Sequence, residues 1–439
     1  MITLFPAILI FMACFLFALT RPKIAIYLPL VFSSAYLVKA QIFGLPSTLL
    51  EIILVAVLLG VWVEFVINHR TDPGTEQPCS VPGSVRVVSR STIIFCGLFL
   101  IGATISALIA PHPYTAWGYW KAMVVEPILY ALTLFFLVEK EKRAEGIVRA
   151  LLLGGLVSVI LSLFTMGFGV DFGRFKGIYD VPNSLALIVA PLCAMSLVGS
   201  LLSWRGRFGL PATDPGTEQG CSVPGSVRLV ARHKLVFALL AVVFGSVLIA
   251  TQSLAGIIAV AIAVLVIILM ENKGWKGFLV IALLIVLGLG LQISTGKLSH
   301  LFNQQSSSFI AREQIWYTAS RMIKQHPILG TGLGTFEPSY QDELRRFSNF
   351  DLISPLEWVV RDPHNVVLSF WLNTGLLGLG AMVVLLVLAL KRLIVALKET
   401  HDQYRIMFGV ALLTLIIFGL FDVPYWKNDL ALIWWVYLL

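Results

Sequence analysis

The stretch HNVVLSFWLNTGLLGLGAMVVLLVLAL, residues 364–390, carries no Asp, Glu, Lys or Arg. An α-helix of about 20 apolar residues crosses the roughly 30 Å hydrocarbon layer of a bilayer, so this stretch is long enough to span a membrane. It begins at His364 and follows the polar run Arg361-Asp362-Pro363. We therefore predict a transmembrane helix with a histidine at its mouth.

Apolar runs of similar length recur from one end of the chain to the other. Of the 439 residues, 58% are hydrophobic and 13% are charged. A soluble domain carries roughly 25% charged residues, so an ordinary soluble globular protein is excluded. We predict an all-α, polytopic membrane helical bundle of about twelve or thirteen spans, because a helix satisfies its own backbone hydrogen bonds in lipid. The candidate spans are residues 2–19, 24–41, 48–68, 92–110, 117–138, 147–169, 183–203, 234–251, 253–270, 275–294, 364–390, 405–422 and 427–439.

The Lys and Arg residues indicate how this single membrane domain, residues 1–439, is oriented. They gather in alternate loops, and the positive-inside rule places those loops in the cytoplasm. Residues 170–182 and 295–363 then face outward, and 295–363 is predicted to be one long extracytoplasmic loop with short interfacial helices. The side of the N-terminus stays open, because it depends on the number of early spans. The net charge of +8 follows from the basic inner loops, so no nucleic-acid partner is expected.

A repeated segment interrupts two of the predicted cytoplasmic loops. Residues 71–90 recur as residues 213–232 with three changes in twenty positions. An old structural repeat would have diverged further and would include the neighbouring helices. We interpret segments 71–92 and 213–232 as recent loop insertions. A paired docking site is the alternative.

The outer loop contains a predicted helix that carries three cations. Apolar residues repeat at helical spacing from Phe309 until Pro327 ends the pattern. The helix is too short and too charged to span, so we expect it to lie at the membrane interface. Arg321 and Lys324 are interpreted as snorkelling cations. For Arg312, the same structural role and a ligand-binding role both stay open.

Glycines at positions 330, 332 and 334 follow this helix. Alternating glycines let backbone N–H groups approach an anion closely. The pattern is also typical of a flexible turn, and no strand–helix unit surrounds it, which excludes a dinucleotide-binding site. Gly332 and Gly334 are therefore supporting candidates for an anion site.

His364 is the candidate catalytic residue at the end of the outer loop. Asp362 is predicted to be the N-cap of the following helix and Pro363 its first residue. A helix N-terminus disfavours imidazolium, so we expect the ring to stay a neutral base. The structural alternative is a capping motif with a solvated histidine. Other groups on the predicted outer face favour the functional interpretation: Arg361, Arg174, Lys176 and Asn183.

Glu126 is a carboxylate at membrane depth in the predicted span 117–138. Burying an acid there is costly, which makes Glu126 a functional candidate by default. Lys121, about one turn earlier in the helix, offers it an ordinary structural partner. Both interpretations stay open.

Several motifs are absent from the sequence. It has no P-loop, no D-x-D pair, no His/Cys metal-ligand spacing and no G-x-S-x-G elbow. We therefore expect neither a metal nor another cofactor. Arginines on the outer face suit a diphosphate, because a guanidinium binds phosphate oxygens bidentately.

Together these motifs resemble the O-antigen ligase and O-antigen polymerase superfamily. The resemblance runs from about residue 170 onward, and the N-terminal third matches only in being rich in predicted helices. The segments that carry it are Gly173–Tyr179, Pro182-Asn183, Thr251-Gln252-Ser253, Arg312 with Trp316, His326–Phe336, Pro363–Asn365 and Asn373–Leu379.

The resemblance implies a metal-independent membrane glycosyltransferase at the outer face of the bacterial cytoplasmic membrane. Its donor would be a polyprenyl-diphosphate-linked glycan, and its acceptor a hydroxyl of a glycan, a lipid or a protein. His364 would deprotonate the acceptor, and in-line attack would invert the anomeric carbon. The cations expected to bind the diphosphate leaving group are Arg312, Arg361, Arg174 and Lys176. The supporting candidates are Asn183, Asn365, Gly332, Gly334 and Glu126.

Two positions depart from the family pattern. Family members often carry an arginine directly after Thr-Gln-Ser, where this chain has Leu254, and a glutamate where it has Asn373. Arg174 or Lys176 would have to replace the missing arginine, or the donor differs. O-antigen ligase is the expected activity, with polysaccharide polymerase and protein O-glycan transferase as alternatives within the family. A transporter or flippase for a lipid-linked glycan is the alternative from another class.

Overall fold

The structure, a computed structural model, falls into two compact units that are described one at a time. It describes residues 3–42, 45–70, 89–138, 140–165, 170–171, 173–203, 224–270, 308–348, 357–400 and 402–438. Unit 1 comprises Met1–Val157, His300–Ala389 and Gly419–Leu439, and unit 2 comprises Ser158–Ser299 and Leu390–Phe418. Most of both repeat copies (71–88 and 213–223), the predicted span 275–294 and loop residues 295–307 lie outside the described residues.

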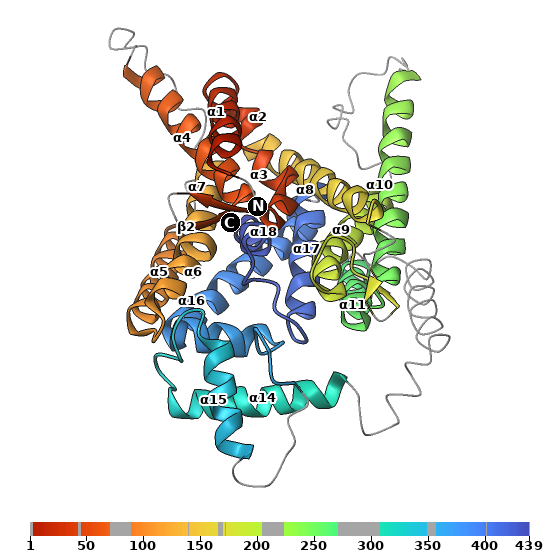
Figure 1. The fold of residues 1–439 in the computed structure, drawn as a ribbon. Coiled ribbons are helices and arrows are strands. Elements are labelled where there is room, and N and C mark those ends of the chain that lie inside the picture. The colour runs from red at the N-terminus through yellow and green to blue at the C-terminus, as the bar shows by residue number, and fades with distance from the viewer. Residues whose placement is uncertain are drawn as a thin grey trace. The chain divides into compact units, whose positions relative to one another are not determined.

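Helices make up most of the described chain, which confirms the predicted all-α class (Figure 1). Those of unit 1 are α1 (Leu4–Thr20), α2 (Pro22–Ala25), α3 (Leu28–Val31), η1 (Ser33–Leu37), α4 (Leu49–Arg70), α5 (Arg90–Ile109), α6 (Pro113–Tyr119), η2 (Trp120–Val125), α7 (Glu126–Leu137), α14 (Ser308–Gln325), α15 (Phe336–Ser348) and α18 (Asn428–Leu438). Those of unit 2 are α9 (Pro182–Ser203), α10 (Pro224–Ala250), α11 (Leu254–Met270), η3 (Ala396–Thr400) and α17 (Gln403–Phe418). Two helices, α8 (Lys140–Leu163) and α16 (Val366–Val395), begin in unit 1 and end in unit 2.

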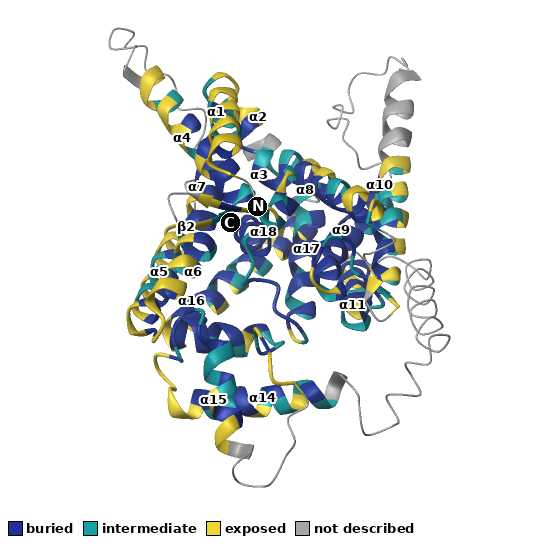
Figure 2. Ribbon diagram, viewed as in Figure 1, coloured by how far each residue is buried: buried dark blue, intermediate teal, exposed yellow. Residues whose placement is uncertain are grey.

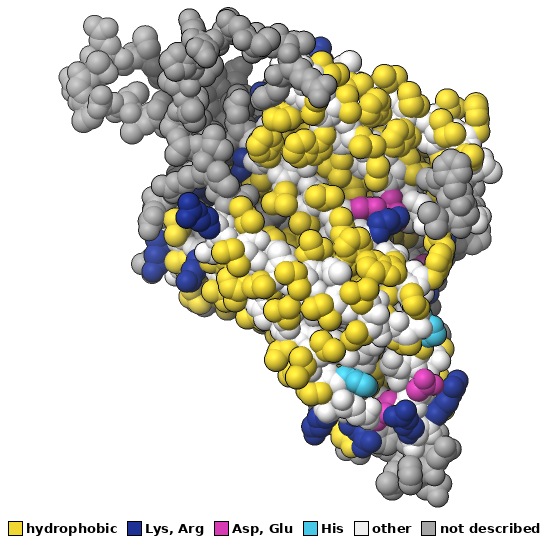
Figure 3. Space-filling view, turned by 90° about the vertical axis from the view of Figure 1, so that its left-hand side faces the viewer, with side chains coloured by type: hydrophobic (Ala, Val, Ile, Leu, Met, Phe, Trp, Pro, Cys, Tyr) yellow, Lys and Arg dark blue, Asp and Glu magenta, His cyan; other side chains and the backbone are white. Residues whose placement is uncertain are grey.

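Six helices among the described residues are long and apolar enough to cross a membrane. They cover Leu49–Asn68, Arg90–Ile109, Pro113–Leu137, Arg143–Leu163, Pro182–Leu202 and Val366–Lys398. Shorter apolar helices cover Leu4–Thr20, Pro22–Val31, Lys234–Ala250, Leu254–Met270 and Gln403–Phe418. Hydrophobic side chains also predominate on the face drawn in Figure 3. The chain is therefore a multi-pass membrane protein.

Two of the predicted spans are not continuous membrane-crossing helices. Residues 24–41 form the short elements α2, α3 and η1 and then strand β1 (Lys39–Ile42), which pairs antiparallel with β2 (Leu45–Thr48). Prolines at the starts of α2 and α3 explain the breaks, since proline begins a helix but cannot continue one. At the other end, α18 has 11 residues and is buried from Asp429 to Leu438. It is about 16 Å long, which is too short to cross the hydrocarbon layer.

A proline also shapes the segment that runs through α6, η2 and α7. In η2, a π-helical turn, the Glu126 N–H donates to the carbonyl of Lys121, five residues earlier. Pro127 has no N–H to offer the carbonyl of Met123, and the Tyr425 hydroxyl donates to that oxygen instead, at 2.7 Å. Residues five apart share one side of a π-turn, so Lys121 and Glu126 face each other.

A kink in α16 positions the glycine loop of unit 1. At Gly375, φ is 67° and ψ is −175°. A Cβ there would lie 2.6 Å from the carbonyl oxygen of Ile328, and the Leu376 N–H donates to that same oxygen at 2.8 Å. Both the backbone angle and the close approach require glycine. The kink thereby docks the loop between α14 and α15 onto α16.

In unit 2, α9 is the central helix. It packs against α10, α11 and α17, and 83% of the residues in its apolar stretch are buried within the protein. Figure 2 shows the buried residues along its length. The connection before α9 contains the short hairpin of β3 (Val170–Asp171) and β4 (Arg174–Phe175), with Gly173 at φ 74° in its turn.

Candidate functional site

Helices α14 and α15 cross each other and form a platform beneath the start of α16 (Figure 1). The buried residues of this platform are Ile315, Ala319, Met322, Ile323, Phe336, Tyr340, Leu344, Val360 and Leu372. Protein, and not lipid, therefore covers the apolar face of α14 that we expected at the membrane interface. Arg321 is not a snorkelling cation as predicted, because its Nε donates to the buried Glu343 at 3.1 Å.

The glycine loop joins α14 to α15 and packs on α16. Its glycines, Gly330, Gly332 and Gly334, have φ angles of 72°, 106° and 70°. The Thr331 N–H donates to the carbonyl of Leu372 and the Gly334 N–H to Oδ1 of Asn373, both at 2.9 Å. These N–H groups are used within the protein, so in this arrangement the loop positions α15. Asn373, which departs from the family pattern, supplies one of the acceptors.

His364 lies in the loop that leads into α16. Its φ of 47° is in the left-handed region, which is uncommon for any residue other than glycine. The conformation is held locally, because the His364 N–H donates to Oδ1 of Asp362 at 3.0 Å. This turn directs the imidazole Nδ1 back toward the carboxylate of Asp362, at 3.7 Å.

The cap of α16 differs from the prediction. Asn365 Oδ1 accepts hydrogen bonds from the N–H groups of Val367, at 3.0 Å, and Leu368, at 3.1 Å. Asn365 is therefore the N-cap and the helix begins at Val366. The expectation that Asp362 caps the helix was wrong, because its side chain is taken by the His364 turn.

Asp422 completes the group around His364. It lies in the connection between α17 and α18, and its Oδ1 is 3.5 Å from Nδ1 of His364. The connection is tied to the start of α16, where the Val366 N–H donates to the carbonyl of Gly419 at 2.7 Å. Sequence reasoning missed Asp422, which is 58 residues from His364 and belongs to no local motif. The one available signal was an acid at the end of the predicted span 405–422.

We call Asp362, His364 and Asp422 the His–Asp cluster. Its two carboxylates change the pKa of the His364 imidazole. Burial lowers the pKa of His364, but the hydrogen bond and charge of Asp422, with the charge of Asp362, outweigh it and raise the pKa to about 9. Burial likewise raises the pKa of Asp422, and the hydrogen bond from His364 outweighs it, so that pKa is lowered. The expected neutral ring is thus wrong for the chain without substrate, because two carboxylates act more strongly than the helix N-terminus.

Cations of unit 1 also act on the His–Asp cluster. The charge of Arg312 on α14 opposes the raised pKa of His364. Burial raises the pKa of Asp362, and the charge of Lys427 opposes that shift without reversing it. Arg312 Nε is buried and makes no hydrogen bond with the residues that the structure describes. Arg361 directly precedes Asp362 and is exposed. Lys427 is a further basic residue that the sequence analysis did not select.

The other predicted cations lie in unit 2. Arg174 donates from Nε to the carbonyl of Thr251 at 3.0 Å and from its terminal nitrogen to Oδ1 of Asn183 at 2.8 Å. Gln252, with φ 51°, donates to the carbonyl of Gly173 at 3.3 Å. The structure thus brings Arg174, Asn183 and the Thr-Gln-Ser turn together. Lys176 follows on the same hairpin and is half-buried.

Glu126 belongs to a separate group in unit 1. Its Oε1 lies 3.9 Å from Nζ of Lys121, so the predicted ion pair is present. Lys121 also donates to Glu51 on α4, which sequence reasoning did not connect with it. None of the described hydrogen bonds or ion pairs joins this group to the His–Asp cluster.

The His–Asp cluster is also the place where the described residues could hold a metal ion. One ligand atom each from Asp362, His364 and Asp422 lies within 4.8 Å of the other two. Two carboxylate oxygens and an imidazole nitrogen suit a divalent cation. Metal binding would require Nδ1 to lose its proton, which the raised pKa of His364 opposes.

Comparison with known proteins agrees with the sequence motifs. Residues 238–383 match a family model described as O-antigen ligase. The matched region contains the Thr-Gln-Ser turn, α14, the glycine loop and His364. No curated protein matches the chain.

Proposed function

We propose that the chain transfers a polyprenyl-diphosphate-linked glycan to an acceptor hydroxyl, and the match of residues 238–383 to a family model described as O-antigen ligase supports this proposal. The observation that carries this proposal is the pairing of His364 with Asp422 at the mouth of a membrane-spanning helix. The reaction would take place at the outer face of the cytoplasmic membrane, where the positive-inside rule puts the loop that ends at His364.

In this mechanism His364 is the general base. Its Nδ1 faces the carboxylates of Asp422 and Asp362, at 3.5 and 3.7 Å, which leaves Nε2 for the acceptor hydroxyl. Asp422 would hold the ring in one orientation and stabilise the imidazolium formed when the hydroxyl proton moves to Nε2. The oxygen would then attack the anomeric carbon and expel the lipid diphosphate, with inversion.

The raised pKa of His364 has a direct kinetic consequence. With a pKa of about 9, most molecules carry a protonated ring at neutral pH, and only the deprotonated fraction can accept a proton. That fraction is a stronger base than an ordinary histidine, because basicity rises with pKa. We therefore propose that turnover increases as the pH approaches 9.

The leaving diphosphate requires cations. Arg312 is suited to this role, because its buried Nε has no hydrogen-bond partner among the described residues and its charge already acts on His364. Arg361 stands exposed beside Asp362 and would supply a second guanidinium. We also propose Arg174 and Lys176 of unit 2 as diphosphate-binding residues, with Asn183 holding the Arg174 side chain.

The proposal is tested by a transfer assay with the purified protein in nanodiscs. The donor is an undecaprenyl-diphosphate oligosaccharide, offered with and without a lipid A–core acceptor, and EDTA is present because the proposed mechanism uses no metal. His364→Ala is compared with His112→Ala, which changes an exposed histidine outside the His–Asp cluster. We expect His364→Ala to lose at least 100-fold in rate, since a general base contributes about 10²–10⁴-fold, and His112→Ala to match the wild type.

The products separate the candidate activities. A single shifted band that needs the acceptor would identify a ligase, and a ladder formed without it would identify a polymerase. Full activity in His364→Ala would overturn the assignment of the base. If the wild type formed no product with either substrate set, a protein acceptor or transport of the lipid-linked glycan would be favoured instead.

A further inference from the structure

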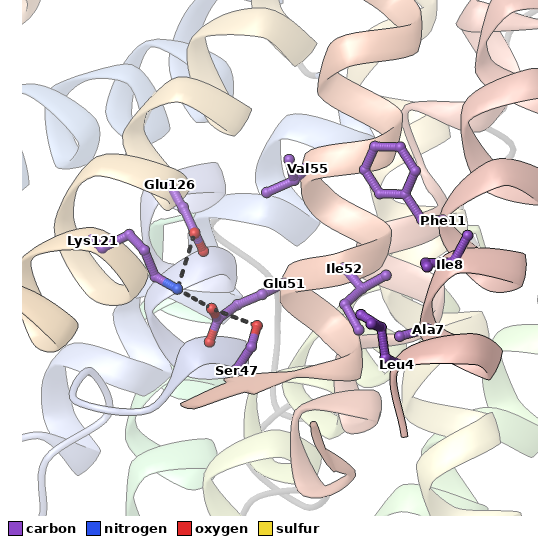
Figure 4. A pocket seen from close by; sticks show the side chains of 10 residues that line it. All are labelled: Leu4, Ala7, Ile8, Phe11, Ser47, Glu51, Ile52, Val55, Lys121 and Glu126. Carbon is purple, nitrogen blue, oxygen red and sulfur yellow. Dashed lines mark hydrogen bonds and ion pairs between the residues drawn. The ribbon is translucent and has the colours of Figure 1, made fainter. Parts of the chain in front are cut away.

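A pocket of about 350 Å³ lies in unit 1 between α1, α4, the η2 turn that carries Lys121 and the start of α7 that carries Glu126 (Figure 4). One wall is apolar and is formed by Leu4, Ala7, Ile8, Phe11, Ile52 and Val55. The opposite wall is polar and is formed by Ser47, Glu51, Lys121 and Glu126. We call this the α1–α4 pocket. The mixed lining is suited to a molecule that has a polar end and an apolar end.

The hydrogen bonds of the polar wall are unevenly distributed between its two carboxylates. Glu51 accepts from Lys121, from the Ser47 hydroxyl at 3.1 Å and from the Asn428 amide at 2.7 Å. Glu126 has Lys121 at 3.9 Å from its Oε1. Its Oε2 is buried and accepts no hydrogen bond from the described residues, although the residue is only 8% exposed.

The Oε2 atom of Glu126 is therefore left without a hydrogen-bond donor among the described residues. Two carboxylates face one ammonium, and all three groups lie on helices that can span the membrane. A buried carboxylate oxygen that accepts no hydrogen bond is costly in such a place, and a bound hydrogen-bond donor would remove that cost. The torsion that turns a carboxylate is soft, so Glu126 can present either oxygen to a ligand.

The position of the polar wall along the helices indicates the kind of ligand. Glu51 is the third residue of the span Leu49–Asn68, which places it near the depth of lipid headgroups. Val55, one turn further along α4, lies about 6 Å deeper. Phe11 on α1 also lines the apolar wall. Glu51, Ser47 and the ammonium of Lys121 thus lie where a headgroup would be, and the apolar wall where an acyl chain would begin. Glu126 is in the middle of the span Pro113–Leu137 and lies on the inner side of the polar wall.

We propose that the α1–α4 pocket binds a zwitterionic phospholipid whose headgroup carries a primary ammonium, the chemistry of phosphatidylethanolamine. The ammonium donates to the Glu126 carboxylate. The phosphate approaches Lys121, whose side chain is 47% exposed. An acyl chain packs against α1 and α4. A choline headgroup has no N–H and cannot supply the missing hydrogen bond, so the site should discriminate between the two lipids.

The test is lipid binding measured by native mass spectrometry on the purified full-length chain in detergent. The probes are palmitoyl-oleoyl phosphatidylethanolamine, phosphatidylcholine and phosphatidylglycerol at matched concentrations, and undecaprenyl phosphate is added as a competitor. One charge-assisted hydrogen bond predicts that the ethanolamine lipid is retained about tenfold more than the choline lipid. Glu126→Gln should abolish this preference, because the amide is neutral. Glu64→Gln, on the same α4 but outside the pocket, should keep it.

Every other outcome decides against the proposal. Equal retention of the ethanolamine and choline lipids would overturn it, as would an unchanged preference in Glu126→Gln. Preference for phosphatidylglycerol would mean that Lys121 recruits an anionic lipid. Displacement of phosphatidylethanolamine by undecaprenyl phosphate would assign the pocket to a polyprenyl chain. The measurement does not depend on glycan transfer, so it stands apart from the proposed function.

Discussion

Two polar clusters of unit 1 have the same outline, a nitrogen between two carboxylates, yet they suit different tasks. In the His–Asp cluster, His364 lies between Asp362 and Asp422. In the α1–α4 pocket, Lys121 lies between Glu51 and Glu126 (Figure 4). A histidine can release and take up a proton, whereas a lysine ammonium only donates hydrogen bonds.

The surroundings reinforce this difference. The His–Asp cluster is built on two loops at the end of a span, and the ring keeps a second nitrogen for a substrate. The lysine cluster is built on helices within the apolar part of the protein, where an unsatisfied oxygen favours a permanently bound partner. On these proposals, the same arrangement of charges would serve proton transfer in one place and ligand binding in the other.

The largest effect is expected when one carboxylate of each cluster is changed to its amide. Asp422→Asn should lower the transfer rate about 100-fold, because the ring loses the charge that orients it and stabilises the imidazolium. Glu51→Gln should leave the rate within about twofold, since it alters no group of the His–Asp cluster. Initial rates in nanodiscs measure both. Equal losses in the two variants would break the comparison and indicate a structural role for Asp422.

The pH dependence sharpens the role of the histidine. Because Asp422 and Asp362 raise the pKa of His364 to about 9, the wild-type rate should increase from pH 7 to about pH 9 and then level off. In Asp422→Asn the carboxylate that raises the pKa of His364 is gone, so the pH at which the rate levels off should be lower. Rate profiles of the two proteins measure this. A wild-type rate that fell between pH 7 and pH 9 would show that the protonated ring is the active form.

The smallest expected effect concerns stability. Glu51→Gln weakens the ion pair with Lys121 and the hydrogen bonds from Ser47 and Asn428. Lys121 is 47% exposed, so the loss should be modest, about 1 kcal/mol. Thermal unfolding in detergent measures it, with Glu64→Gln as the control on the same helix. An unchanged midpoint in Glu51→Gln would mean that the cluster contributes nothing to folding.

Most helices could be predicted from local pattern, and the exceptions have identifiable causes. Uncharged runs such as 364–390 predicted α16, and periodic apolar residues from Phe309 predicted α14. The run 24–41 was misjudged because hydropathy does not register the helix breaks that begin at Pro22 and Pro29. Hydropathy also cannot tell a lipid-facing helix from α18, which is buried in protein.

The candidate site was predictable only where its residues lie close together in the sequence. Arg361, His364 and Asn365 follow one another, and the motif around them indicated a site. Asp422 could not be found this way, since its approach to His364 depends on the hydrogen bond between Val366 and Gly419. The protonation state of the ring depends on that approach, which is why the expected neutral histidine was wrong.

By itself, the sequence determined that this protein lies in a membrane and that it is built of helices, because these properties follow from composition and from the length of the hydrophobic runs, and its short motifs indicated a resemblance to the O-antigen ligases. Tertiary structure decided which groups meet. It brought Asp422 to His364, Glu343 to Arg321 and Glu51 to Lys121. Such pairs lie on different elements, and a charge acts through its distance in space and not through its distance along the chain.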